Sequence, residues 1–81
     1  PMSGEYDIVR PGMTVEIENF NTEKVMTYTI LGEFESDPNQ GSISYKSPLG
    51  KELLNMRVGD CVELQRGADI IEYEILRIFV E

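Results

Sequence analysis

The sequence contains no histidine, no tryptophan and a single cysteine, Cys61. The absence of histidine excludes a Ser-His-Asp triad, an imidazole general base and the histidine-dependent transition-metal sites. A lone cysteine cannot form a disulfide within the chain or supply a cysteine-based zinc site. We therefore expect no metal or other cofactor, and a fold held together by burial of apolar side chains.

Basic residues are also scarce. The chain has 7 lysines and arginines against 15 aspartates and glutamates, which gives a net charge of −8. Proteins bind phosphate backbones through lysine and arginine, so direct binding to nucleic acid is disfavoured. The negative charge can simply keep the domain in solution, or it can steer the domain towards a basic protein surface.

Long apolar runs are missing too. No segment approaches the roughly 20 apolar residues of a membrane span, and no signal-peptide pattern opens the chain, so we expect a cytoplasmic protein. With 81 residues, of which 41% are hydrophobic and 27% charged, the composition is typical of one small globular domain. We assign residues 1–8 to a flexible N-terminal tail or a remnant of cloning, and residues 9–81 to the domain.

One stretch, residues 47–55, combines a helix start signal with helical apolar spacing. Ser47 can cap the helix, and Pro48 suits its first position because its φ is already fixed. The apolar face consists of three leucines, Leu49, Leu53 and Leu54. A helix of two turns is marginal alone, so this face must be covered. Gly50 costs about 1 kcal/mol relative to alanine inside a helix, which indicates that another surface approaches closely there.

Five segments show the alternation or the β-branched composition typical of strands. They are residues 13–20, 25–31, 42–46, 61–65 and 70–80. In the last segment the apolar positions shift by one after Ile75, which indicates a β-bulge or burial on both faces. We therefore predict an α+β domain in which a curled antiparallel sheet of about five strands packs on one short helix.

The predicted core places the three leucines against the inward face of this sheet. That face consists of Met13, Val15, Ile17, Tyr28, Ile30, Val62, Leu64, Tyr73 and Ile75. Residues 32–41 form a polar loop, and its carboxylates lack the ligand spacing and central glycine of a calcium loop. No phosphate-binding glycine motif and no nucleophile beside a base is present, so we predict a non-catalytic binding domain.

Four motifs follow one another in the second half of the chain: GEFESDP at 32–38, GSIS at 41–44, SPLGKELL at 47–54 and VGD at 58–60. In this order and spacing they resemble the C-terminal domain of the bacterial GreA/GreB transcript-cleavage factors, over about residues 9–80. The resemblance implies the FKBP-like fold, which agrees with the architecture predicted above. Residues 66–69 depart from the Pro-Gly turn that many members have.

The resemblance also implies a partner, bacterial RNA polymerase. In the GreA/GreB family this domain docks at the rim of the polymerase secondary channel, on the tip of a coiled coil of the largest subunit. A separate N-terminal coiled coil stimulates the polymerase's own cleavage of RNA, and this sequence contains no heptad-patterned helical hairpin. We therefore expect polymerase binding without stimulation of cleavage, by a piece of a full factor or by a shorter Gre-like regulator.

The family's docking surface corresponds here to the acidic loop and the following helix start. The polymerase contacts that the resemblance implies are Asp37, Ser47, Pro48, Leu49 and Lys51, with Phe34 and Tyr45 as support. Ser47 and Pro48 can instead serve the helix cap alone, and Leu49 the core alone.

Two other functions stay open. FKBP-like folds include peptidyl-prolyl isomerases, whose proline pocket is lined by aromatic residues and commonly has a tryptophan at its floor, a residue this chain lacks. A Gre-like regulator that blocks the channel rim is the other alternative.

Overall fold

The computed structural model describes residues 4–32, 37 and 41–80. The elements are β1 (Gly4–Glu5), β2 (Thr14–Asn19), β3 (Lys24–Leu31), β4 (Ser42–Ser44), α1 (Pro48–Leu53), β5 (Cys61–Arg66) and β6 (Asp69–Val80). Within these described ranges, no helix is long and apolar enough to cross a membrane.

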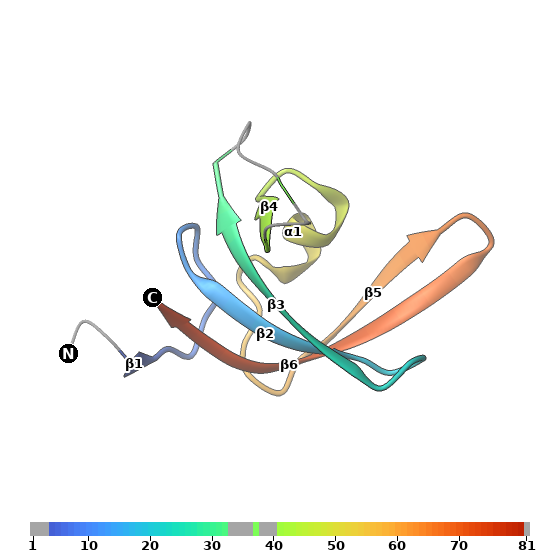
Figure 1. Ribbon diagram of the computed structural model, residues 1–81, viewed down its shortest axis with the longest axis horizontal. Helices are drawn as coiled ribbons and strands as arrows, with labels where there is room; N and C mark the ends of the chain where they lie inside the picture. Colours follow the sequence, from blue (N-terminus) through green and yellow to red (C-terminus); the bar gives the residue numbers. More distant parts are fainter. Residues whose placement is uncertain (1–3, 33–36, 38–40, 81) are drawn as a thin grey trace.

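The strands form one sheet in the order β1-β6-β2-β3-β4, and β5 pairs with β6 beside this path. The sheet bends strongly, so that α1 lies in its concave side between β3 and β5 (Figure 1). The predicted fold class, a curled sheet packed on one short helix, is confirmed. The expectation of a wholly antiparallel sheet is wrong at β4, which pairs with β3 in parallel. A parallel neighbour needs a connection longer than a hairpin turn, and residues 32–41 provide it.

A β-bulge in β6 explains the shift of its apolar positions. Glu16 of β2 is opposite Arg77 of β6, whereas the next residue, Ile17, is opposite Ile75, so Leu76 is an extra residue on β6. The extra residue keeps Ile75 and Ile78 on the same face of the sheet, and both are fully buried. Of the two interpretations that the sequence leaves open, the bulge is therefore confirmed.

The core lies between α1 and the concave face of the sheet. Leu53 is fully buried, whereas Leu49 and Leu54 are half-buried and pack against the same cluster. The other fully buried apolar residues are Val9, Val15, Ile17, Ile30, Ile75 and Ile78. Each such side chain stabilises the fold by about 1.5–3 kcal/mol through burial alone. The short helix is thus held by packing, as its length requires.

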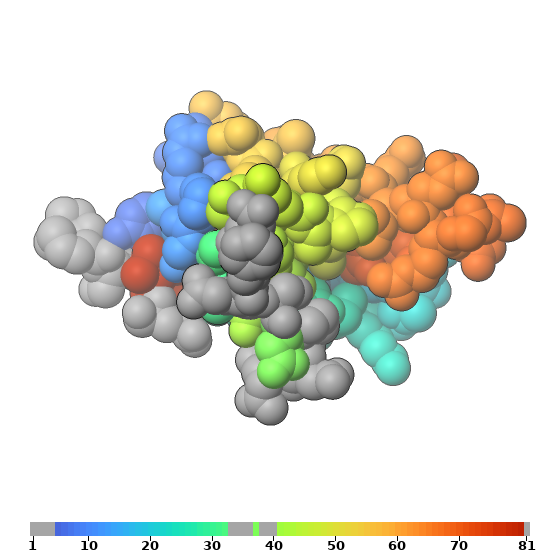
Figure 2. Space-filling view, turned by 90° about the horizontal axis from the view of Figure 1, so that it is seen from above, coloured from blue at the N-terminus to red at the C-terminus, as the bar shows by residue number. Residues whose placement is uncertain are grey.

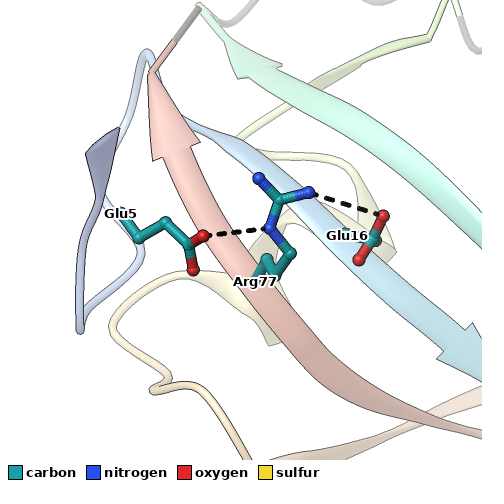
Figure 3. Close-up of polar contacts among 3 residues, drawn as sticks. All are labelled: Glu5, Glu16 and Arg77. Carbon is teal, nitrogen blue, oxygen red and sulfur yellow. Dashed lines mark hydrogen bonds and ion pairs between the residues drawn. The ribbon is translucent and has the colours of Figure 1, made fainter. Parts of the chain in front are cut away.

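The start of the described chain lies along β6. The two residues of β1 pair with Val80 and Phe79, and the Tyr6 N–H donates to the Ile78 carbonyl at 2.8 Å. Figure 3 shows Arg77 between two carboxylates: its Nε lies 3.3 Å from Glu5 Oε2 and its Nη1 lies 4.0 Å from Glu16 Oε2. Arg77 and Glu5 are exposed and Glu16 is half-buried, so both pairs lie at the surface and each contributes at most about 1 kcal/mol. The domain boundary at residue 9 stays a prediction, although residues 4–8 already lie against the sheet.

Candidate functional site

An apolar groove, which we call the helix-start groove, lies where α1 begins. Its volume is about 210 Å³. It is lined by Tyr28 from β3, Ile43 from β4, Ser47, Pro48 and Leu49 from the start of α1, and Leu64 and Arg66 from β5. Figure 2 shows the start of α1 exposed at the surface next to the hairpin formed by β5 and β6. The groove therefore joins segments that are far apart in the sequence.

The cap at Ser47 fixes one wall of the groove. The Ser47 hydroxyl accepts a hydrogen bond from the Gly50 N–H at 3.1 Å and donates one to the Ser44 carbonyl at 2.6 Å. Pro48 occupies the first turn, as predicted. The hydroxyl thus ties the helix start to the end of β4, and Pro48 is left exposed at the mouth of the groove.

Gly50 explains how closely α1 approaches β4. A Cβ atom added at this position would lie 2.1 Å from the Ser44 carbonyl oxygen, which is far inside van der Waals contact. The sequence indicated that another surface comes close to Gly50, and the structure shows that this surface is the chain's own strand β4. The glycine therefore allows Ile43 and Pro48 to line the same groove.

The other predicted site residues lie around the groove. Asp37 is exposed and exchanges two backbone hydrogen bonds with Ser42, of 2.9 and 3.0 Å, which extends the sheet beyond β4. Lys51 is exposed on α1, and Tyr45 is half-buried against the core. Neither Asp37 nor Lys51 lines the groove, and Phe34 lies outside the described residues. The binding roles of all these residues stay predictions.

Four lining residues were not among the predicted contacts: Tyr28, Ile43, Leu64 and Arg66. The strand alternation assigned Tyr28 and Leu64 to the core, and Arg66 was considered only as part of a turn. Both assignments describe the local sequence correctly, since Leu64 is buried and Arg66 ends β5. No local signal indicates that the curl of the sheet brings these positions to the helix start.

Arg66 is the charged member of the groove lining, and no carboxylate is among the lining residues. The hydroxyl of Tyr28 donates to the Met26 sulfur at 3.6 Å. Tyr73 of β6 lies close to both residues: burial raises the pKa of its phenol, Arg66 opposes this shift, and Tyr28 adds to it. The groove lining thus combines Arg66 with Tyr28, and both affect the pKa of the neighbouring Tyr73 phenol.

The opposite face of the sheet is acidic. Strand alternation places Glu63 and Glu72 on that face, directly opposite each other, and Cys61 opposite Glu74. Desolvation, Glu72, Glu74 and Asp60 raise the pKa of the exposed Cys61 thiol, in that order of effect. Across residues 4–32, 37 and 41–80, no three cysteine or carboxylate side chains are grouped to hold a metal ion.

A family model and individual relatives, compared with this chain, both indicate the same family of proteins. A family model described as "Transcription elongation factor, GreA/GreB, C-term" matches residues 4–79. The chain is 42% identical over 72 residues to the transcription elongation factor GreA of Alkaliphilus oremlandii. This match covers 89% of this chain and 45% of that protein. It is 40% identical over 77 residues to GreA of Maricaulis maris, and this match covers 95% of this chain and 48% of that protein. The chain therefore spans about half the length of these relatives.

A solved structure with the same fold is that of Gfh1 from Thermus aquaticus. The two superpose with a TM-score of 0.77 at 30% sequence identity, and the match covers 88% of this chain and 47% of Gfh1. The curled sheet and its single short helix are therefore shared with a natural protein of known structure.

Proposed function

The chain belongs to the GreA/GreB family of transcription elongation factors, whose C-terminal domain it matches, and we propose that it binds bacterial RNA polymerase through the helix-start groove. The observation that carries this proposal is the position of Ser47, Pro48 and Leu49. These three residues, which the family resemblance marked as contacts, line one apolar groove that is open at the surface.

The size of the groove favours a protein partner. Pockets for small molecules commonly enclose about 300–1,000 Å³, whereas this groove has a volume of about 210 Å³. That space suits one or two side chains presented by the tip of another protein. The family resemblance implies where such a partner lies: at the rim of the polymerase secondary channel, on the exposed end of a coiled coil of the largest subunit.

The domain acts by binding and not by catalysis. Among the groove residues, the Ser47 hydroxyl is already engaged in the helix cap, and the lining contains no carboxylate or cysteine that could act as a base or nucleophile. In this proposal the domain positions a Gre-type factor on the polymerase, and any cleavage of RNA is carried out by the polymerase.

A binding experiment with two variants tests this function. The 81-residue chain is titrated against bacterial core RNA polymerase, as wild type and as Pro48→Ala and Asp37→Lys. Removing the exposed Pro48 ring from a docked surface is expected to weaken binding by about fivefold, which corresponds to about 1 kcal/mol. Asp37→Lys, which reverses a predicted contact charge, is also expected to weaken binding.

The matched control is Pro11→Ala, because Pro11 is also exposed but lies in a turn that does not line the groove. Circular dichroism confirms that each variant is folded. Wild-type affinity in both Pro48→Ala and Asp37→Lys would show that the docking surface lies elsewhere, and failure of the wild type to bind polymerase would refute the function itself.

A further inference from the structure

Arg66 is a cation at the edge of an apolar groove and has no partner among the described residues. Its side chain is exposed and lines the groove, and within the described residues it makes no hydrogen bond or ion pair. Asp69, its register partner across the turn, forms no ion pair with it. The guanidinium therefore keeps all its donors available to a ligand.

Two phenols lie beside this guanidinium. The Tyr28 hydroxyl donates only to a sulfur, a weak acceptor, at 3.6 Å. Tyr73 is 5% exposed, and its hydroxyl makes no hydrogen bond to the described part of the chain. Arg66 and Tyr28 line the same groove, and each has an electrostatic effect on the pKa of the Tyr73 phenol. Tyr28 and Arg66 thus give the groove hydrogen-bond donors, and its lining contains no carboxylate acceptor.

The charge of the lining is opposite to that of the molecule. The chain has 15 acidic residues and a net charge of −8, yet the groove lining contains an arginine and no carboxylate. The remaining lining residues are mainly apolar, with Ile43, Pro48 and Leu64 among them. A ligand that matches both properties has an apolar side chain for the groove and an anionic group for Arg66.

We infer that the groove binds a short partner segment in which an aliphatic side chain stands next to an aspartate or glutamate. The aliphatic side chain fills the space between Ile43, Pro48 and Leu64, and the carboxylate pairs with the Arg66 guanidinium. This inference rests on the proposed function only where it assigns the segment to RNA polymerase; the side-chain chemistry follows from the groove itself. The arginine then sets the direction in which the segment lies.

Peptides test the chemistry without polymerase. The ¹⁵N-labelled chain is titrated with acetyl-Gly-Leu-Asp-Gly-amide and with the Leu-Asn peptide, and amide chemical shifts are followed by NMR. The Leu-Asp peptide is expected to shift the amides of Ile43, Leu64 and Arg66, and to bind at least about threefold more tightly than the Leu-Asn peptide. Arg66→Gln should remove this difference, and Arg66→Glu should favour a Leu-Lys peptide instead.

Arg57→Gln is the matched control, because Arg57 is exposed and does not line the groove. This variant should keep the preference for the Leu-Asp peptide. Equal affinity of the wild type for the Leu-Asp and Leu-Asn peptides, or an unchanged preference in Arg66→Gln, overturns the inference whatever the polymerase experiment shows.

Polymerase binding tests the assignment of the segment. Arg66→Glu should weaken binding to core RNA polymerase at least about fivefold, whereas Arg57→Glu, with the same charge change, should have no such effect. If the wild type does not bind polymerase, the proposed function fails and the peptide titration alone decides the inference. If polymerase binds Arg66→Glu and the wild type equally, the acidic segment does not belong to polymerase and that assignment is overturned.

Discussion

Replacement of Gly50 by alanine should destabilise this domain, although the same change stabilises most helices. Alanine is about 1 kcal/mol more favourable than glycine inside a helix. Here the new Cβ would lie 2.1 Å from the Ser44 carbonyl oxygen and 3.0 Å from the Ser47 hydroxyl. Both neighbours belong to the segment that joins β4 to α1, and the closer one is backbone, which cannot rotate away.

The size of the destabilisation by Gly50→Ala follows from this contact. Because real Cβ atoms essentially never come within 3.0 Å of another heavy atom, α1 and β4 must separate by about 1 Å. Overpacking of this kind typically costs about 1–3 kcal/mol. In a domain of this size each kcal/mol lowers the melting temperature by about 4–8 °C. Because the 2.1 Å contact is with backbone, the cost lies at the upper end of this range, and the helix propensity of alanine offsets about 1 kcal/mol of it. The net loss of about 2 kcal/mol should make Gly50→Ala melt about 8–16 °C below the wild type.

Thermal and urea unfolding followed by circular dichroism measure this effect. Glu52→Ala is the control, since Glu52 is exposed on the same helix and its replacement should change the free energy of unfolding by less than about 0.5 kcal/mol. A Gly50→Ala variant that melts at or above the wild-type temperature would refute the close approach of α1 to β4, and with it the shape of the groove.

Three further predictions concern the core, the thiol and the alternative activity. Leu53→Ala should lower the free energy of unfolding by about 2–5 kcal/mol in urea titrations, because Leu53 is fully buried; a smaller loss than for the half-buried Leu54→Ala would contradict the packing described. Cys61 should react with iodoacetamide at pH 8 more slowly than a free cysteine peptide, since its raised pKa leaves less thiolate, and Glu74→Gln should speed the reaction. A standard proline-isomerisation assay should show no rate above background, and clear turnover would favour the isomerase alternative.

The helix could be predicted from the sequence because capping is local. Ser47 caps the helix and Pro48 is its first residue, and both roles involve only residues within one turn. Neighbouring residues alone were therefore enough to predict them. The β-bulge was indicated in the same way, by a shift of the apolar period after Ile75. Local rules therefore predicted α1, the strands β2 to β6 and much of the core, but not the two residues of β1.

The groove could not be predicted because its parts meet only through the curvature of the sheet. Tyr28 and Leu64 follow the ordinary alternation of half-buried strands, and nothing in that pattern distinguishes a groove wall from the core. The parallel pairing of β4 with β3 is likewise a long-range feature that the alternation within each strand does not indicate. The placement of Arg66 at the groove follows from these long-range features.

The most direct test of the central claim, that the helix-start groove is the polymerase docking surface, is site-specific cross-linking. The photoreactive residue p-benzoylphenylalanine is placed at Tyr28, which lines the groove, and in a control at Val58, which is exposed but does not. After irradiation with core RNA polymerase, the Tyr28 probe should cross-link to the largest subunit at the rim coiled coil, and the Val58 probe should not. Equal cross-linking from both positions, or none from Tyr28 while the complex forms, would contradict the account.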